Sequence, residues 1–181
     1  SGSQAGEEVR GYVQDVAPDL ADRVSTWTSE QDVFTAYRVH EQLAKAMDRK
    51  VWLPSGGSLV IDRTEAMTVV DVNTGKFVGS GGNLEETVTK NNIEAAEEIV
   101  RQLRLRDIGG IIVVDFIDME IESNKRAVLE EMRKELRKDR ARTKAFAVSD
   151  LGLVEMTRQR ERSSLLHYYT EDCPHCGGLG K

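Results

Sequence analysis

Residues 111–116 read Ile-Ile-Val-Val-Asp-Phe, and this short apolar stretch decides the fold class of the chain. A continuous apolar run of this length is typical of a central strand that is covered on both faces. Gly109 and Gly110 directly precede the run and would end any helix before it. The segment therefore predicts a buried strand that follows a helix, as in α/β proteins.

The segments before this strand continue the alternation of strands and helices. Two further strands are expected at 59–62 and 67–71, joined by a short polar turn. Asn83, with Glu86 three residues later, resembles a capping box that begins a helix running to about Arg106. The apolar stripe that this helix would bury consists of Leu84, Val88, Ala95, Ile99 and Leu103.

A second helix and two more strands are expected after residue 116. Ser123 would cap the helix, and its apolar face would carry Val128, Met132 and Leu136. The strands are expected at 144–148 and 153–157. Together these elements predict an α/β domain over about 51–160, with a layered sheet and flanking helices.

The N-terminal part of the chain is polar and has weaker signals. Ser1–Ser3 has the composition of an expression remnant and is set aside. Val39, Leu43 and Met47 are spaced four apart, which predicts one amphipathic helix over 33–50. Residues 52–57, Trp-Leu-Pro-Ser-Gly-Gly, then form a turn.

The charge of the chain is acidic in sum but uneven. The 181 residues include 25 Lys and Arg against 31 Asp and Glu, a formal net charge of −6, which argues against a nucleic-acid partner. Residues 125–144 reverse this with nine bases and four acids. A solvated helix face explains such a run unless other features indicate phosphate contact. No apolar run approaches the roughly 20 residues that span a bilayer and no signal peptide opens the chain, so membrane insertion is not expected.

Two aspartates occupy unusual positions for charged residues. Asp71 ends one predicted strand and Asp115 lies near the end of another, where ligand sites of open α/β sheets are found. If the two strands are parallel neighbours, both carboxylates converge and could share Mg²⁺. Asn73 would point the same way and could hold a phosphate oxygen or a metal-bound water. The alternative is that both carboxylates cap loops or helix ends, which is also the expected role of Asp118.

Other common catalytic and nucleotide-binding motifs are absent or have the wrong spacing. Gly79-Ser80-Gly81-Gly82 lacks the third glycine of a dinucleotide-binding loop, because Leu84 occupies that position. No phosphate-binding GxxxxGK[ST] loop is present, and the three histidines have no spacing that suggests a nucleophilic hydrolase.

The only two cysteines form the motif Cys173-Pro174-His175-Cys176, followed by Gly-Gly-Leu-Gly. A redox pair would need a following helix, and a disulfide across two residues would be strained. A zinc knuckle fits the glycines, but it supplies two of the four ligands that structural zinc requires. A second copy of the motif from another chain would complete the site and link a homodimer; His167 is a local alternative.

Several motifs together resemble the catalytic core of the bacterial ribonuclease E/G family, over essentially 33–181. They are the segments 52–57, Asp71-Val72-Asn73-Thr74-Gly75, the run from Asn83 to Asp107, Asp115-Phe116-Ile117-Asp118-Met119 and the cysteine motif. The resemblance implies an endoribonuclease that cuts single-stranded, often AU-rich RNA and leaves 5′-phosphate and 3′-hydroxyl ends. It implies that Asp71 and Asp115 hold catalytic Mg²⁺, that Asn73 supports them, and that Cys173 and Cys176 share structural Zn²⁺ between protomers.

The resemblance also implies a domain organisation. Residues 4–50 would end an RNase H-like segment, 51–165 would form a DNase I-like catalytic subdomain, and 166–181 would form the zinc-link. The family's OB-fold, 5′-sensor and C-terminal dimerisation domains are not in this sequence, which predicts an excised core of a cytoplasmic bacterial enzyme. A homodimer is expected, with a tetramer as a further expectation for the parent enzyme. The candidates for RNA contact are Lys76, Arg133, Arg137 and Arg140.

Two other functions fit the same residues. The fragment could be a zinc-linked oligomerisation and RNA-docking module without activity of its own. A general Mg²⁺-dependent phosphodiesterase or DNase would use the same two carboxylates, but it would act equally on DNA.

Overall fold

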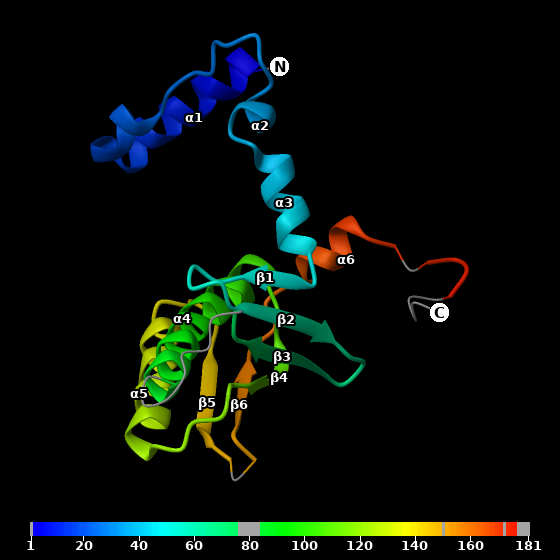
Figure 1. Cartoon of the computed structure of the whole chain (residues 1–181). Coiled ribbons are helices and arrows are strands. Elements are labelled where there is room, and N and C mark those ends of the chain that lie inside the picture. Colours follow the sequence, from blue (N-terminus) through cyan, green and yellow to red (C-terminus); the bar gives the residue numbers. More distant parts are fainter. Residues whose placement is uncertain (1, 76–83, 150, 172, 177–181) are drawn as a thin grey trace. The chain divides into compact units, whose positions relative to one another are not determined.

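The computed structural model describes residues 2–75, 84–149, 151–171 and 173–176 (Figure 1). The chain divides into two compact units, residues 1–43 and 44–181. The boundary expected from the resemblance lies after Lys50 and stays a prediction. Among the described residues, no helix is both long and apolar enough to cross a bilayer.

The first unit is helical. It contains α1 (Gly2–Val16), the 3₁₀ helix η1 (Pro18–Arg23) and α2 (Val33–Ala36), and α3 (Val39–Met47) leads out of it. The prediction of one helix over 33–50 is wrong, because Arg38 has a left-handed φ of 53° between α2 and α3. Asp32 caps α2 by accepting a hydrogen bond from the Thr35 amide at 2.9 Å.

The second unit is built on a six-stranded sheet with the order β1-β2-β3-β4-β6-β5. The strands are β1 (Lys50–Trp52), β2 (Ser58–Arg63), β3 (Met67–Asn73), β4 (Gly110–Asp115), β5 (Thr143–Val148) and β6 (Leu153–Arg158). All neighbouring pairs are antiparallel except β3 and β4, which are parallel. The α/β class and the four strands predicted outside 111–116 are confirmed, whereas β1 was not predicted.

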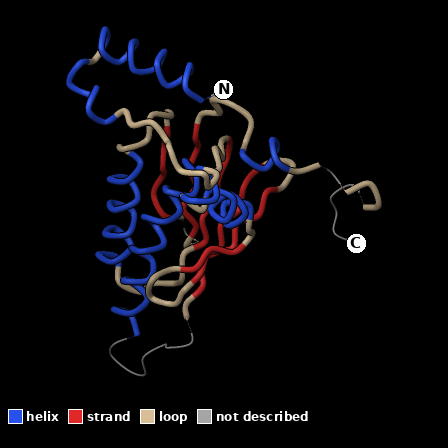
Figure 2. Tube along the Cα trace, turned by 90° about the horizontal axis from the view of Figure 1, so that it is seen from above, coloured by secondary structure: helices blue, strands red, loops and turns tan. Residues whose placement is uncertain are grey.

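Two long helices, α4 (Leu84–Leu105) and α5 (Glu122–Leu136), pack on each other along one side of the sheet (Figure 2). The core lies between them and the sheet, with Leu59, Val70, Ile99, Ile112 and Met132 almost fully buried. A short helix, α6 (Leu165–Tyr169), follows β6.

The prediction that 111–116 is covered on both faces is wrong for the described part of the chain. Ile112 and Val114 point into the core and are fully buried, but Ile111 is 50% exposed and Val113 is half-buried. The reason is that α4 and α5, which flank β4 in sequence, lie on the same side of the sheet (Figure 2).

The helix boundaries differ in detail from the sequence prediction. Leu84 is 43% exposed rather than buried, whereas the rest of the predicted α4 stripe is buried. The predicted Asn83 cap lies outside the described residues. Ser123 does not cap α5, which begins at Glu122. Instead, the Glu85 carboxylate on α4 accepts hydrogen bonds from the backbone amides of Glu120 and Ile121, at 3.2 and 3.1 Å.

Candidate functional site

The parallel pair β3 and β4 brings the two strand-end aspartates opposite each other. Asp71 and Asp115 are direct register partners, and adjacent strands lie about 4.8 Å apart. Their neighbours Val70 and Val114 point into the core, so alternation places both carboxylates on the face away from α4 and α5. The two strands are therefore parallel neighbours, which is the arrangement that lets the two carboxylates converge.

Asn73 lies two residues beyond Asp71 and on the same face of the sheet. Its Nδ2 donates a hydrogen bond to Oδ2 of Asp71 at 2.8 Å. This contact restricts the orientation of the Asp71 carboxylate, whose other oxygen accepts no side-chain hydrogen bond from a described residue. The amide therefore acts on the carboxylate pair through Asp71.

The electrostatics of the pair are unbalanced. Burial raises the pKa of Asp115, and the nearby carboxylates of Asp71 and Asp118 raise it further. Neither Asp71 nor Asp115 forms an ion pair with any residue in the described ranges. A cation between the two carboxylates would relieve this repulsion.

The donor set fits one kind of metal better than others. Within the described ranges, no three His, Cys, Asp or Glu side chains are grouped so that they could hold a metal ion together. Zinc and calcium sites generally need more protein ligands than the two carboxylates provide. Mg²⁺ is commonly bound through one or two carboxylates, with water and substrate phosphate as the other ligands. The Asp71–Asp115 pair therefore fits Mg²⁺.

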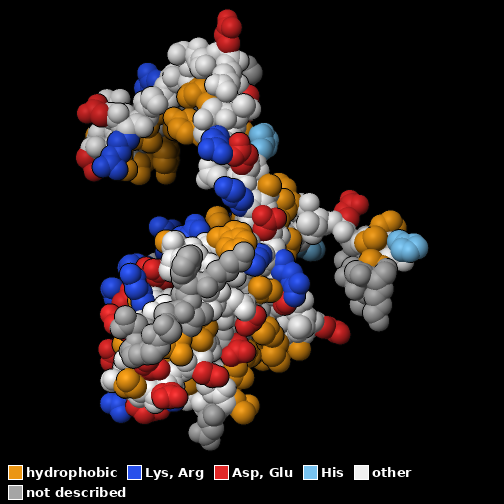
Figure 3. All heavy atoms as spheres, viewed as in Figure 1, with side chains coloured by type: hydrophobic (Ala, Val, Ile, Leu, Met, Phe, Trp, Pro, Cys, Tyr) orange, Lys and Arg blue, Asp and Glu red, His pale blue; other side chains and the backbone are white. Residues whose placement is uncertain are grey.

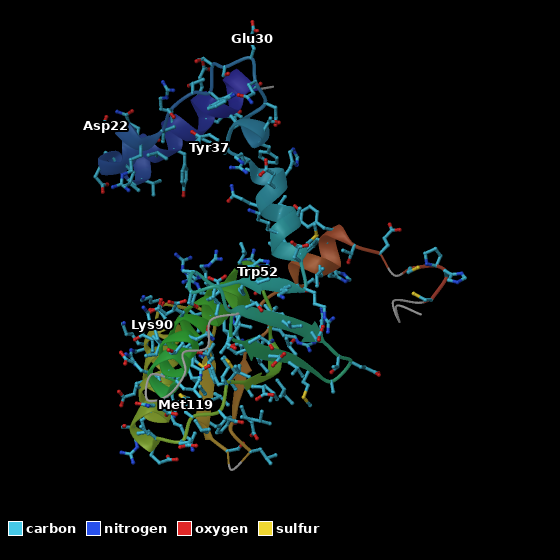
Figure 4. All side chains as sticks on the ribbon, in the orientation of Figure 1. Asp22, Glu30, Tyr37, Trp52, Lys90 and Met119 are labelled. Carbon is cyan, nitrogen blue, oxygen red and sulfur yellow. The ribbon has the colours of Figure 1, made fainter. Side chains whose placement is uncertain are left out.

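A buried asparagine on α4 fixes the loop that follows Asp115. Asn92 is fully buried; its Nδ2 donates to the Ile117 carbonyl at 2.8 Å and its Oδ1 accepts from the Ile117 amide at 3.2 Å. Figure 4 shows this region, with Lys90 on α4 and Met119 in the loop. The sequence pattern alone predicts no role for Asn92. Its signal is a polar residue on the apolar stripe that contains Val88 and Ala95.

The turn 53–57 supports the end of β3 from the other side. The Ser55 hydroxyl donates to Oδ1 of Asn91 at 3.2 Å, and the Ser55 amide donates to the Glu94 carboxylate at 3.0 Å. A Cβ at Gly57 would lie only 2.1 Å from Oδ1 of Asn91 and 2.8 Å from the carbonyl oxygen of Asn73. Gly57 therefore allows the close approach that holds the backbone of Asn73 in place.

The basic stretch 125–144 carries less free positive charge than its composition indicates. Lys125, Lys134 and Lys138 each pair with a glutamate three residues earlier. Acidic and basic side chains accordingly intermingle over α4 and α5 (Figure 3).

The RNA-contact candidates differ in their surroundings. Arg133 donates to the Ala145 carbonyl at 3.3 Å. Arg137 and Arg140 are exposed and form no ion pair with a described residue. Lys76 lies outside the described residues.

The two cysteines lie close together near the C-terminal end of the described chain. Pro174–Cys176 form a turn, and no disulfide joins the exposed Cys173 to the partly buried Cys176. No third metal ligand accompanies them in the part of the chain that the structure describes. His167, the local alternative, lies in α6.

Comparison with known proteins agrees with these motifs. A model of the Ribonuclease E/G family matches residues 1–161. Ribonuclease G of Escherichia coli (strain K12) is 46% identical over 174 residues, which cover 96% of this chain and 35% of the relative. Ribonuclease E of Haemophilus influenzae is 45% identical over 97% of this chain and 19% of the relative. Ribonuclease E of Escherichia coli (strain K12) is 47% identical over 90% of this chain and 15% of the relative.

The chain thus spans about a third of the length of this ribonuclease G relative and a smaller share of the two ribonuclease E relatives. The family match covers most of the sequence, including both strand-end aspartates and Asn73. The chain belongs to the ribonuclease E/G family.

Proposed function

We propose that this chain carries the cleavage site of a Mg²⁺-dependent endoribonuclease that acts on single-stranded RNA in the bacterial cytoplasm, in RNA processing and mRNA decay. The observation that supports this most directly is the opposed pair Asp71 and Asp115, which lies on the exposed face of the sheet without a basic partner in the described chain. The printed names of the relatives, ribonuclease G and ribonuclease E, support RNA as the substrate.

In this proposal each residue of the site has a separate task. Asp71 and Asp115 hold the ion, and Asn73 keeps the Asp71 carboxylate in one orientation through its 2.8 Å hydrogen bond. A bound Mg²⁺ would polarise the scissile phosphate and lower the pKa of the attacking water. Asn92 and Gly57 act indirectly, because they fix the backbone on either side of the carboxylates. No side chain of the protein has to act as nucleophile.

On the opposite side of the sheet from the carboxylates, the RNA strand would be held in part along α5 and the segment that follows it. Arg137 and Arg140 are the candidates that the structure leaves exposed and without an ion pair to a described residue. Arginine binds phosphate through parallel hydrogen bonds, and such contacts do not depend on base identity. This arrangement supports binding of RNA by its backbone.

The experiment compares Asp71→Asn and Asp115→Asn with the unchanged chain in cleavage of a 5′-monophosphorylated single-stranded oligoribonucleotide, with and without Mg²⁺. Loss of a direct metal ligand is expected to lower the rate about a hundredfold or more. Binding, followed by fluorescence anisotropy, should persist. Retained cleavage by either variant would remove that residue from the metal role. If the unchanged chain binds RNA without cutting it, the docking-module alternative is favoured, and equal cutting of DNA would favour a general phosphodiesterase.

Zinc is the second metal of the proposal. Cys173 and Cys176 would supply two thiolates to an ion shared with the same motif of a second chain, so that a dimer forms. Metal analysis should then give about half a zinc per chain, and a chelator should dissociate the dimer in sedimentation. The Cys173→Ser variant is expected to be monomeric. One zinc per chain would contradict sharing and would indicate a local ligand such as His167.

A further inference from the structure

A cavity of about 720 Å³ lies at the opposite ends of β3 and β4 from the carboxylates. Its walls come from β2, the start of β3, the loop between α4 and β4, and the segment leading into α6 (Figure 1). Five arginines line it, against three acidic residues: Arg49, Arg63, Arg106, Arg160 and Arg162, with Asp62, Asp107 and Glu161. The volume lies in the range of small-molecule binding sites, and the lining is net positive.

Only part of this positive charge is matched by carboxylates. Arg49 pairs with Asp62, with an Nη2–Oδ2 distance of 2.6 Å, and Arg162 pairs with Asp107 at 2.7 Å. Arg63 donates to the neutral Ser164 hydroxyl at 2.9 Å. Within the described ranges, the other two arginines, like Arg63, form no ion pair.

Arg106 is the buried member of this group, with 3% of its surface exposed. Its Nε donates to Oε1 of Gln102 and its Nη1 to the Asp48 carbonyl, both at 2.7 Å. Its Nη2 is buried and has no hydrogen-bond partner in the described part of the chain. A buried donor of a charged group without a hydrogen-bond partner is unfavourable, so Arg106 adds incompletely compensated positive charge to the cavity wall.

Arg160 lies at the edge of the same cavity, close to the backbone of two glycines. A Cβ at Gly109 would lie 2.7 Å from Cγ of Arg160, and one at Gly110 would lie 3.0 Å from its Nη2. The backbone at Gly109 leaves room for the Arg160 side chain because Gly109 has no Cβ, whereas the contact at Gly110 is with the flexible end of that side chain. The Arg160 guanidinium thus lies beside Gly110 at the cavity rim.

We propose that this cavity binds a phosphate group between Arg63 and Arg160, with Arg106 among the residues that line its wall. The phosphate could belong to the RNA backbone or to a free phosphorylated small molecule, since both present the same oxygens to arginine. About 20 Å of strand separates Gly109 from Asp115, so the cavity is a site distinct from the carboxylate pair. The proposal does not depend on cleavage.

The test measures binding to the 181-residue chain by isothermal titration calorimetry without Mg²⁺, using inorganic pyrophosphate and a short 5′-hydroxyl oligouridylate as separate probes. Arg63→Gln and Arg160→Gln each remove one charged donor and should weaken binding of the recognised probe about tenfold. Arg126→Gln, which removes an exposed charge on α5 outside the cavity, is the matched control and should bind as the unchanged chain does. Arg106→Lys keeps the charge but loses the fork, and it should also weaken binding.

Each outcome either identifies the source of the phosphate or contradicts the proposal. Cavity-dependent binding of pyrophosphate identifies a free phosphorylated ligand, and cavity-dependent binding of the oligonucleotide alone identifies the RNA backbone. Absence of binding, or binding that is as strong in Arg63→Gln and Arg160→Gln as in Arg126→Gln, would overturn the proposal even if Arg106→Lys fails to fold. Asp115→Asn should bind the probe normally, which separates failure here from failure of the cleavage site.

Discussion

The two ends of the parallel strands β3 and β4 differ in the sign of their unpaired charges. Arginines gather at the amino ends and carboxylates at the carboxyl ends. At the amino ends, Arg158, Arg162 and Arg49 are paired with carboxylates over short distances, whereas Arg63, Arg106 and Arg160 form no ion pair with a described residue. At the carboxyl ends, Asp71 and Asp115 face each other without a basic partner in the described chain. Removal of one partner from the buried pair at Arg158 would leave an uncompensated charge, whereas the two carboxylates at the other end already repel each other and are available for a ligand. The net charge of −6 conceals this division.

The largest effect on stability is expected from Arg158 at the amino end. It is 6% exposed and donates to both Oδ2 and Oδ1 of Asp139, at 2.8 and 3.3 Å, and to Asp107 at 3.1 Å. Burial opposes both charges, but the hydrogen bonds outweigh it, so the pKa of Arg158 is raised and the pKa of Asp139 is lowered. Arg158→Met leaves Asp139 buried and unpaired and should lower the free energy of unfolding in urea by about 3–5 kcal/mol.

The double variant Arg158→Met/Asp139→Asn is the control for this prediction. It removes the stranded charge and should recover part of the loss. A loss below about 1 kcal/mol in Arg158→Met would show that the Arg158–Asp139 pair contributes no more than an exposed ion pair. The pairing of charges at the amino ends would then not explain the stability of the fold.

A smaller effect, and one on activity rather than stability, is expected from Asn73 at the carboxyl end. Asn73→Ala removes the amide that orients Asp71 and should lower the cleavage rate about 10–100-fold, the range found for groups that orient metal ligands. A higher Mg²⁺ concentration should restore part of the rate. Thr157→Ala, at an exposed polar position on the same face of β6, should cleave normally. Unchanged cleavage by Asn73→Ala, or no response to Mg²⁺, would show that Asp71 needs no orientation.

Much of the carboxyl end could be predicted from local sequence, and little of the amino end. Asp71 and Asp115 are visible because a charge at the end of an apolar strand is unusual, and Asn73 follows from the two-residue period. Their pairing still required knowledge that β3 and β4 are parallel neighbours. Arg158 gives no local signal, because its partner Asp107 is distant in sequence and meets it only in the folded sheet.

The two wrong predictions, for the coverage of β4 and for the cap of α5, have the same physical origin. Coverage of β4 was predicted on both faces because its residues are apolar throughout, but coverage depends on where α4 and α5 pack. Ser123 has the residue type of a cap, yet Glu85 from another helix satisfies the amides before α5. Local propensity identifies candidates for a role, and tertiary contacts decide which candidate takes it.

The smallest effect is expected from two aspartates, Asp115 and Asp62, whose titration should change the stability of the fold in opposite directions. The pKa of Asp115 is raised, so the folded state retains its proton at higher pH than the unfolded state, and stability falls as pH rises through this window. Without Mg²⁺, Asp115→Asn should therefore raise the melting temperature near neutral pH, by no more than about 2 °C because solvent screens the group. Mg²⁺ should stabilise the unchanged chain but not this variant.

Asp62, at the amino end, has a pKa that is shifted in the opposite direction from that of Asp115. The hydrogen bonds from Arg49 lower its pKa, so its contribution to stability is present at neutral pH and is lost as the pH falls through the folded-state pKa. Asp62→Asn should accordingly lower the melting temperature at neutral pH, and its difference from the unchanged chain should vanish in acid. Thermal unfolding followed by circular dichroism between about pH 3 and 7 covers both windows. If the two variants shift the melting temperature in the same direction, charge pairing does not distinguish the two ends of the sheet.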